Sequence, residues 1–133
     1  MTTTPQRHQQ HQQQQRVLIA DDEPNIVVSL EYLMKREGYE VHVARDGDEA
    51  LAALRRLRPA LVLLDVMMPG KTGHEVLAAA RADETLAGLK VLMLTAKGRD
   101  TDVAQGLGLG ADAYMTKPFS TQALAAKVKE LLK

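Results

Sequence analysis

The stretch LVLLDVMMPG, residues 61–70, decides the fold class. Its apolar residues 61–64 lead directly to one carboxylate, Asp65, and a Pro-Gly pair follows soon after. An uninterrupted apolar run of this kind predicts a strand that is covered on both faces, which is typical of parallel sheets. The acid at its end points to function, because ligands of open parallel α/β sheets bind beyond the carboxyl ends of the strands.

Outward from this stretch, short apolar runs alternate with longer segments of helical spacing. The predicted strands are residues 17–20, 41–44, 61–66, 91–95 and 112–116. Apolar residues at helical spacing fall within 26–34, 50–57, 76–80 and 124–132, and a helix over roughly 99–109 completes the series. Strands that alternate with helices predict parallel pairing and right-handed crossovers, and therefore a doubly wound α/β sandwich.

Bulk composition limits the class of protein. The 133 residues are 45% hydrophobic, which suffices for one domain with its own core. Equal numbers of basic and acidic side chains, 17 each, argue against a nucleic-acid or membrane surface built on net charge. The chain has no cysteine, no signal-peptide pattern and no apolar run near the roughly 20 residues that span a bilayer. We therefore expect a soluble cytoplasmic protein.

Residues 1–15, MTTTPQRHQQHQQQQ, differ sharply from the rest. They contain seven glutamines and no aliphatic side chain larger than that of Met1. Such a segment buries too little apolar surface to offset its ordering entropy. We expect a disordered tail, with His8 and His11 solvated, followed by one folded domain at 16–133.

Polar side chains follow the predicted strands at their carboxyl ends. They are Asp21, Asp22, Asp65, Thr95 and Lys117. Taken singly, Asp21 or Asp22 can cap the helix that begins near Pro24, and Asp65 can open a turn. If the first strand lies between the second and the third, however, three carboxylates and a hydroxyl meet in one cleft.

Carboxylates a few ångströms apart are costly unless protons are retained or a cation neutralises them. Mg²⁺ fits such a set, because it binds through a few carboxylates and keeps several waters. A carboxylate beside a metal, a hydroxyl and an ammonium has the parts that hold a phosphoryl group. A carboxylate can also be the nucleophile that receives it.

Four motifs resemble, in order and spacing, the receiver domain of two-component response regulators, a CheY-like domain. They are ADDEPN (20–25), LVLLDVMMPGKTG (61–73), VLMLTAK (91–97) and GADAYMTKPF (110–119). The resemblance covers residues 16–133. It implies a flavodoxin-like sandwich with a five-stranded parallel sheet of order 2-1-3-4-5 and helices on both faces.

The resemblance also implies roles for the strand-end residues. Asp65 would accept a phosphoryl group from a phosphohistidine on a sensor histidine kinase or a histidine phosphotransfer protein. Thr95 and Lys117 would contact the oxygens of that group. The peptide bond before Pro118 would be cis and would aim Lys117 inward.

A metal site and a switch are implied in the same way. The expected Mg²⁺ ligands are Asp22 and Asp65, the backbone carbonyl of Met67, and Asp21, with Asp22 preferred over Asp21 as a direct ligand. Tyr114 matches the aromatic switch position, although a tyrosine on a half-buried strand is also an ordinary structural feature. The phosphoryl group would draw the Thr95 hydroxyl inward, and Tyr114 would turn into the space vacated. The face formed by the fourth predicted helix, the fifth predicted strand and the fifth predicted helix would then change for partner binding.

Three hypotheses describe the output. In the first, a single-domain regulator or phosphorelay carrier binds an unknown output protein. In the second, the chain is the excised receiver of a longer DNA-binding transcription regulator, which homodimerises on phosphorylation while the receiver itself binds no nucleic acid. In the third, the site belongs to an aspartyl-phosphate phosphatase, an enzyme.

The third hypothesis ranks last. Haloacid-dehalogenase-type phosphatases carry a second Asp as acid/base two residues after the nucleophile, where this chain has Met67. The first ranks above the second, because Gln105, Gly108 and Ala113 stand where the winged-helix DNA-binding branch commonly carries charge. Lys127 and Glu130 are accordingly expected to be solvated. We therefore expect a phosphorylation-dependent signalling switch that is not an enzyme.

Overall fold

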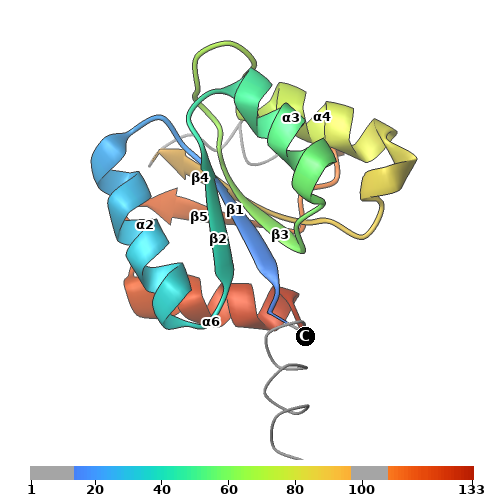
Figure 1. Cartoon of the computed structure of the whole chain (residues 1–133). Coiled ribbons are helices and arrows are strands. Elements are labelled where there is room, and N and C mark those ends of the chain that lie inside the picture. Colours follow the sequence, from blue (N-terminus) through green and yellow to red (C-terminus); the bar gives the residue numbers. More distant parts are fainter. Residues whose placement is uncertain (1–13, 97–107) are drawn as a thin grey trace, which may run out of the picture.

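The computed structural model describes residues 14–96 and 108–133. Five parallel strands form one sheet of order β2-β1-β3-β4-β5, which confirms the predicted fold class (Figure 1). The strands are β1 (Arg16–Ala20), β2 (Glu40–Ala44), β3 (Leu61–Asp65), β4 (Lys90–Ala96) and β5 (Ala113–Lys117). The helices are α2 (Pro24–Arg36), α3 (Gly47–Leu57), α4 (Gly73–Ala82) and α6 (Thr121–Leu131), with a short 3-10 helix η1 (Glu84–Leu86).

Two predicted segments fall mainly outside the described residues: the glutamine-rich tail, of which only 14 and 15 are described, and most of the helix expected over 99–109. Within 14–96 and 108–133, no helix has the length and apolar character needed to cross a membrane.

Helices cover both faces of the sheet (Figure 1). α3 and α4 pack on one face, over a core that includes Val62 of β3 and Met93 of β4. α2 and α6 pack on the other, over a core that includes Leu63 and Leu92. Neighbouring strand residues point to opposite faces, so a strand buried on both sides is apolar throughout. This explains the unbroken apolar run before Asp65.

Local hydrogen bonds fix where α4 begins. The Thr72 hydroxyl accepts a bond from the backbone N–H of Glu75, and the Glu75 carboxylate accepts one from the N–H of Thr72. This reciprocal capping box satisfies two backbone donors that the helix itself leaves unpaired.

A close backbone contact joins α4 to the end of β3. The Gly73 N–H donates to the Val66 carbonyl oxygen across 2.8 Å. A Cβ atom on Gly73 would lie 2.3 Å from the carbonyl oxygen of Asp65. The first turn of α4 therefore packs directly on the backbone that carries Asp65, and only glycine leaves room for it.

The suggestion that Asp21 or Asp22 caps the helix near Pro24 is wrong. The N-cap residue of α2 is Glu23, and no side chain makes a capping hydrogen bond there. Asp21 Oδ1 instead accepts a bond from the Glu23 backbone N–H across 2.9 Å. Pro at the start of the helix needs no donor partner, which lowers the need for a cap.

Candidate functional site

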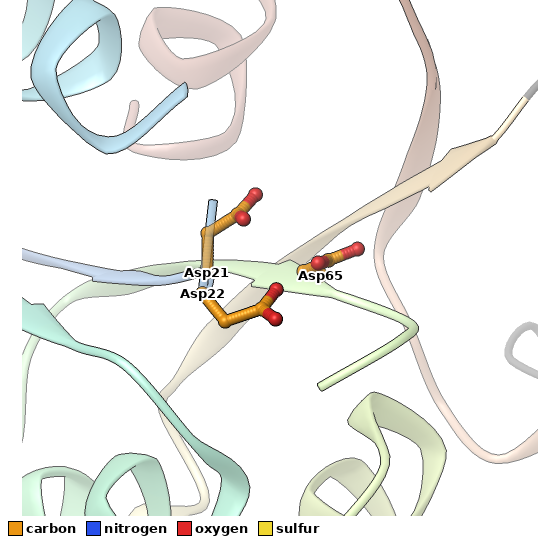
Figure 2. A group of neighbouring side chains, drawn as sticks. All are labelled: Asp21, Asp22 and Asp65. Atoms are coloured by element: carbon orange, nitrogen blue, oxygen red, sulfur yellow. The ribbon is translucent and has the colours of Figure 1, made fainter. Parts of the chain in front are cut away.

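Three carboxylates meet at the carboxyl ends of β1 and β3 (Figure 2). Asp21, Asp22 and Asp65 each offer one carboxylate oxygen, and these oxygens lie within 4.8 Å of one another. Asp21 and Asp65 are buried, whereas Asp22 is exposed. The convergence follows from the sheet, because β1 and β3 are parallel neighbours with Ala20 opposite Leu64. The expected acidic cluster is therefore present.

Lys117 reaches the same cluster from the end of β5. Its Nζ atom lies 2.9 Å from Oδ2 of Asp21 and 3.4 Å from Oδ1 of Asp65. The Lys117–Pro118 peptide bond is cis, as expected. Burial by itself lowers the pKa of Lys117, but the hydrogen bond to Asp21 and the Asp65 charge outweigh it, so the pKa is raised. Lys117 is thus a cation at neutral pH.

The environment of Asp65 disfavours its charged form. Its pKa is raised from 3.8 to about 6, first by burial and then by the charge of Asp21. Lys117 and the Met67 backbone N–H, which donates to Asp65 Oδ1 across 3.3 Å, act in the opposite direction without cancelling the rise. Among the described residues, the Lys117 ammonium contacts two of the three clustered carboxylates, Asp21 and Asp65, and one positive charge against three negative charges leaves the cluster with net negative charge.

This donor set fits a hard divalent cation. Oxygen ligands in a group small enough to surround one ion, with uncompensated negative charge, suit Mg²⁺ better than a soft metal. Asp22 is exposed and can bind an ion that keeps part of its water. The backbone carbonyl of Met67 stays a predicted ligand.

Thr95 lies at the end of β4, next to the residue that pairs with Asp65. The register sets Asp65 opposite Leu94, and Thr95 is 2% exposed. Its hydroxyl donates to the carbonyl oxygen of Ala96 across 3.5 Å, a long and weak hydrogen bond. A better acceptor near Asp65 would meet little competition for this hydroxyl.

Tyr114 has a partner that sequence analysis missed. It is half-buried on β5, and its hydroxyl oxygen lies 2.9 Å from Nε2 of His74 on α4. His74 is 7% exposed. Its spacing of three residues from the buried Leu77 would have placed it on the inner face of α4. Sequence spacing alone does not bring residue 74 next to residue 114.

The expected solvation of Lys127 and Glu130 on α6 needs a small amendment. Lys127 Nζ lies 3.2 Å from Oε1 of Glu130, as a pair three residues apart on one helix. The side chains stay 34% and 66% exposed, so solvent screens the pair and its contribution is small.

Known proteins share this fold. A family model described as the response regulator receiver domain matches residues 17–129. The chain therefore belongs to the family of response regulator receiver domains of two-component signalling.

Two relatives are about equally similar to this chain. The chain is 44% identical over 118 residues to the DNA-binding response regulator MtrA of Mycolicibacterium smegmatis, covering 89% of this chain and 50% of that protein. It is 45% identical over 118 residues to the alkaline phosphatase synthesis transcriptional regulatory protein PhoP of Bacillus subtilis, covering 89% and 48%. The chain thus spans about half the length of these relatives.

Solved structures agree with the fold. A putative response regulator from Chloroflexus aurantiacus superposes with a TM-score of 0.86 at 34% identity, over 90% of this chain and 98% of that one. The chemotaxis response regulator CheY4 of Vibrio cholerae gives 0.84 at 32% identity, over 90% and 99%.

Proposed function

We propose that this chain is a Mg²⁺-dependent switch that is activated by phosphorylation of Asp65. The observation that carries the proposal is the meeting of Asp65 with two further carboxylates and the Lys117 ammonium at one end of the sheet. An isolated acid there has many explanations. An acid with a raised pKa, an ion-paired lysine and a metal-sized group of oxygens fits phosphoryl transfer.

In the proposed reaction, a carboxylate oxygen of Asp65 attacks the phosphorus of a phosphohistidine. The new O–P bond forms as the N–P bond to the donor imidazole breaks, and the product is an aspartyl phosphate. Lys117 and Thr95 contact the transferred oxygens. Asp22, Asp65, Asp21 and the Met67 carbonyl would hold Mg²⁺, which when bound supplies positive charge against the phosphoryl oxygens. The donor is a sensor histidine kinase or a histidine phosphotransfer protein, in the cytoplasm.

The signal leaves the site through Thr95 and Tyr114. The two lie on neighbouring strands, with Met93 and not Thr95 directly opposite Tyr114, so Thr95 is its diagonal neighbour on the same face of the sheet. When the Thr95 hydroxyl turns toward the phosphoryl group, Tyr114 follows and the surface around β5 and α6 changes for an output partner. Lys117 contacts the phosphoryl group in this proposal and links it to the end of β5. Lys117→Ala should therefore abolish the difference in partner affinity between the phosphorylated and the unphosphorylated protein.

The chain is proposed to store a phosphoryl group rather than to turn over substrate. Met67 occupies the position two residues after Asp65, and a thioether supplies no general acid or base. This disfavours the phosphatase hypothesis.

A second candidate output has its own support. Both named relatives are transcriptional or DNA-binding regulators about twice the length that this chain covers. In that case the present chain is the receiver of a longer DNA-binding regulator, and phosphorylation would drive homodimerisation. Size-exclusion chromatography of the phosphorylated chain separates the hypotheses: a dimer favours the longer regulator, and a persistent monomer favours the single-domain regulator or phosphorelay carrier.

Phosphorylation with acetyl phosphate and phosphoramidate tests the proposal. Wild type, Asp65→Asn and the control Asp48→Asn are incubated with and without Mg²⁺ and weighed by intact-mass spectrometry. Asp48 suits the control because its carboxylate is exposed and pairs with Lys71 outside the acidic cluster. We expect one phosphoryl group in wild type and the control, only with Mg²⁺. Undiminished phosphorylation of Asp65→Asn would overturn the assignment.

A further inference from the structure

The hydrogen bond between His74 and Tyr114 connects two elements that lead to the site, β5 and α4. Tyr114 belongs to β5, the strand that also carries Lys117. His74 belongs to the first turn of α4, which follows the loop after Asp65. The bond joins side chains 40 residues apart across 2.9 Å.

The backbone around His74 is fixed by local hydrogen bonds. It follows Gly73, whose backbone N–H donates to Val66, and it lies inside the capping box of Thr72 and Glu75. With 7% exposure, the imidazole has little room to change rotamer. A hydrogen-bonding group with a fixed position favours one orientation of any mobile side chain that bonds to it.

Tyr114 is the partner that the proposed switch would move. It packs, half-buried, against the core between the sheet and α3 and α4. Because its hydroxyl bonds to a buried imidazole of α4, the ring lies against this core and not out in solvent. That is the inward orientation, which the proposed switch requires when Thr95 turns toward the phosphoryl group.

We infer that His74 is a positioning residue that holds Tyr114 inward before phosphorylation and so adjusts the switch toward its active form. The inference rests on the proposed function of Asp65 and Tyr114. If a contact favours the orientation that phosphorylation also favours, linkage requires that its loss weakens binding of a phosphoryl analogue at Asp65. A histidine that merely fills the core would leave that affinity unchanged.

The test is the affinity for beryllofluoride with Mg²⁺, measured by NMR titration. We expect His74→Leu to bind the analogue about two- to tenfold more weakly than wild type, the range that one net hydrogen bond supplies. His74→Gln, whose amide can still bond to a hydroxyl, should recover part of the loss. In a Tyr114→Phe background, His74→Leu should change the affinity by less than about 1.5-fold, since the bond is already absent.

A matched control is His42→Leu. His42 lies on β2, where its Nε2 atom is 2.7 Å from Oε2 of Glu40, away from β5 and α4. This variant should keep wild-type affinity for the analogue. Equal affinity of wild type and His74→Leu for the analogue would overturn the inference. So would a loss of affinity from His74→Leu that is as large in the Tyr114→Phe background as in wild type. Tighter binding by His74→Leu would show that the bond holds the inactive orientation, and would also overturn it.

Two further measurements keep the outcomes distinct. Should His74→Leu not fold, His74→Phe keeps a planar aromatic ring and removes the hydrogen bond, and it carries the same expectation. Wild-type protein with ¹³C-labelled tyrosine should show a smaller shift of the Tyr114 ring signals on beryllofluoride binding than the His74 variant shows; a larger shift in wild type would contradict the inference. If wild type binds no beryllofluoride at all, the proposed function of Asp65 itself fails.

Discussion

The Nζ atom of Lys117 lies 2.9 Å from Oδ2 of Asp21, whose side chain is completely buried. The two residues are 96 positions apart, so the pair forms only when the sheet brings the ends of β1 and β5 to the same edge. The same ammonium lies 3.4 Å from Asp65. Lys117 therefore links the stability of the sheet edge to the charge of the proposed phosphoacceptor, Asp65.

Replacement of Lys117 by Met should destabilise the metal-free protein. The change keeps most of the side-chain length but leaves the Asp21 carboxylate buried without its cation, and breaking a buried pair in this way costs about 3 kcal/mol. The free energy of unfolding from urea titration in EDTA measures the loss. Lys127→Met is the control, because its pair with Glu130 is exposed and is worth ~0.5 kcal/mol or less. Equal losses in the two variants would contradict the account.

The protonation of Asp65 should appear in the pH dependence of stability. Its pKa is about 6 in the folded chain against 3.8 ordinarily, so the folded state binds the proton more tightly than the unfolded state does. Ionised Asp65 therefore destabilises the fold above about pH 6, and this penalty shrinks as the pH falls from 6 to 3.8. In full it amounts to ~3 kcal/mol.

The difference between wild type and Asp65→Asn isolates this effect from other titrating groups. In EDTA, Asp65→Asn should be the more stable protein at pH 7 to 8, and the two free energies of unfolding should converge by about pH 4. Parallel curves across this range would mean that Asp65 has an ordinary pKa in the folded protein.

Asp22 separates metal binding from fold stability, because it is the exposed member of the acidic cluster. Asp22→Ala should weaken Mg²⁺ binding at least about tenfold and leave the free energy of unfolding in EDTA within ~0.5 kcal/mol of wild type. The rise in melting temperature with added Mg²⁺ reports the affinity. Asp48→Ala, which removes another exposed acid, should respond to Mg²⁺ like wild type. An unchanged response in Asp22→Ala would remove this residue from the metal site.

Gly73 tests the packing that positions Asp65. In Gly73→Ala, the new Cβ would lie 2.3 Å from the Asp65 carbonyl oxygen and 2.9 Å from the Val66 Cα, so the backbone must shift. Such overpacking should cost about 1–3 kcal/mol and should slow phosphorylation. Gly88→Ala is the matched control, since nothing lies within 4 Å of its added Cβ. A Gly73→Ala protein as stable as Gly88→Ala would show that the β3–α4 contact is soft.

The fold was predictable from sequence because the central strands are covered on both faces. The unbroken apolar run at residues 61–64 indicates this burial by itself. The gathering of Asp21, Asp65 and Lys117 followed from the rule that parallel strands end at one edge. Predicted strand 61–66 ends one residue earlier, at Asp65, a difference typical of element boundaries.

Other features needed three-dimensional contacts. The carboxylate of Asp21 has the right position in sequence to cap α2, yet its two oxygens are taken by the Glu23 N–H and by Lys117. His74 looks like one polar residue in an apolar helix face until β5 places Tyr114 against it. Periodicity identifies which face is buried, but it does not identify which side chain from a distant strand meets that face.

The most direct test of the central claim is to identify the residue that carries the phosphoryl group. Wild type is phosphorylated with phosphoramidate and Mg²⁺ and then reduced with borohydride, which converts an acyl phosphate to an alcohol. Peptide mass spectrometry then locates the reduced residue. We expect homoserine at position 65 and nowhere else, and only when Mg²⁺ is present. Homoserine at another aspartate, or an acid-stable phosphate on a hydroxyl or imidazole with position 65 unmodified, would contradict it.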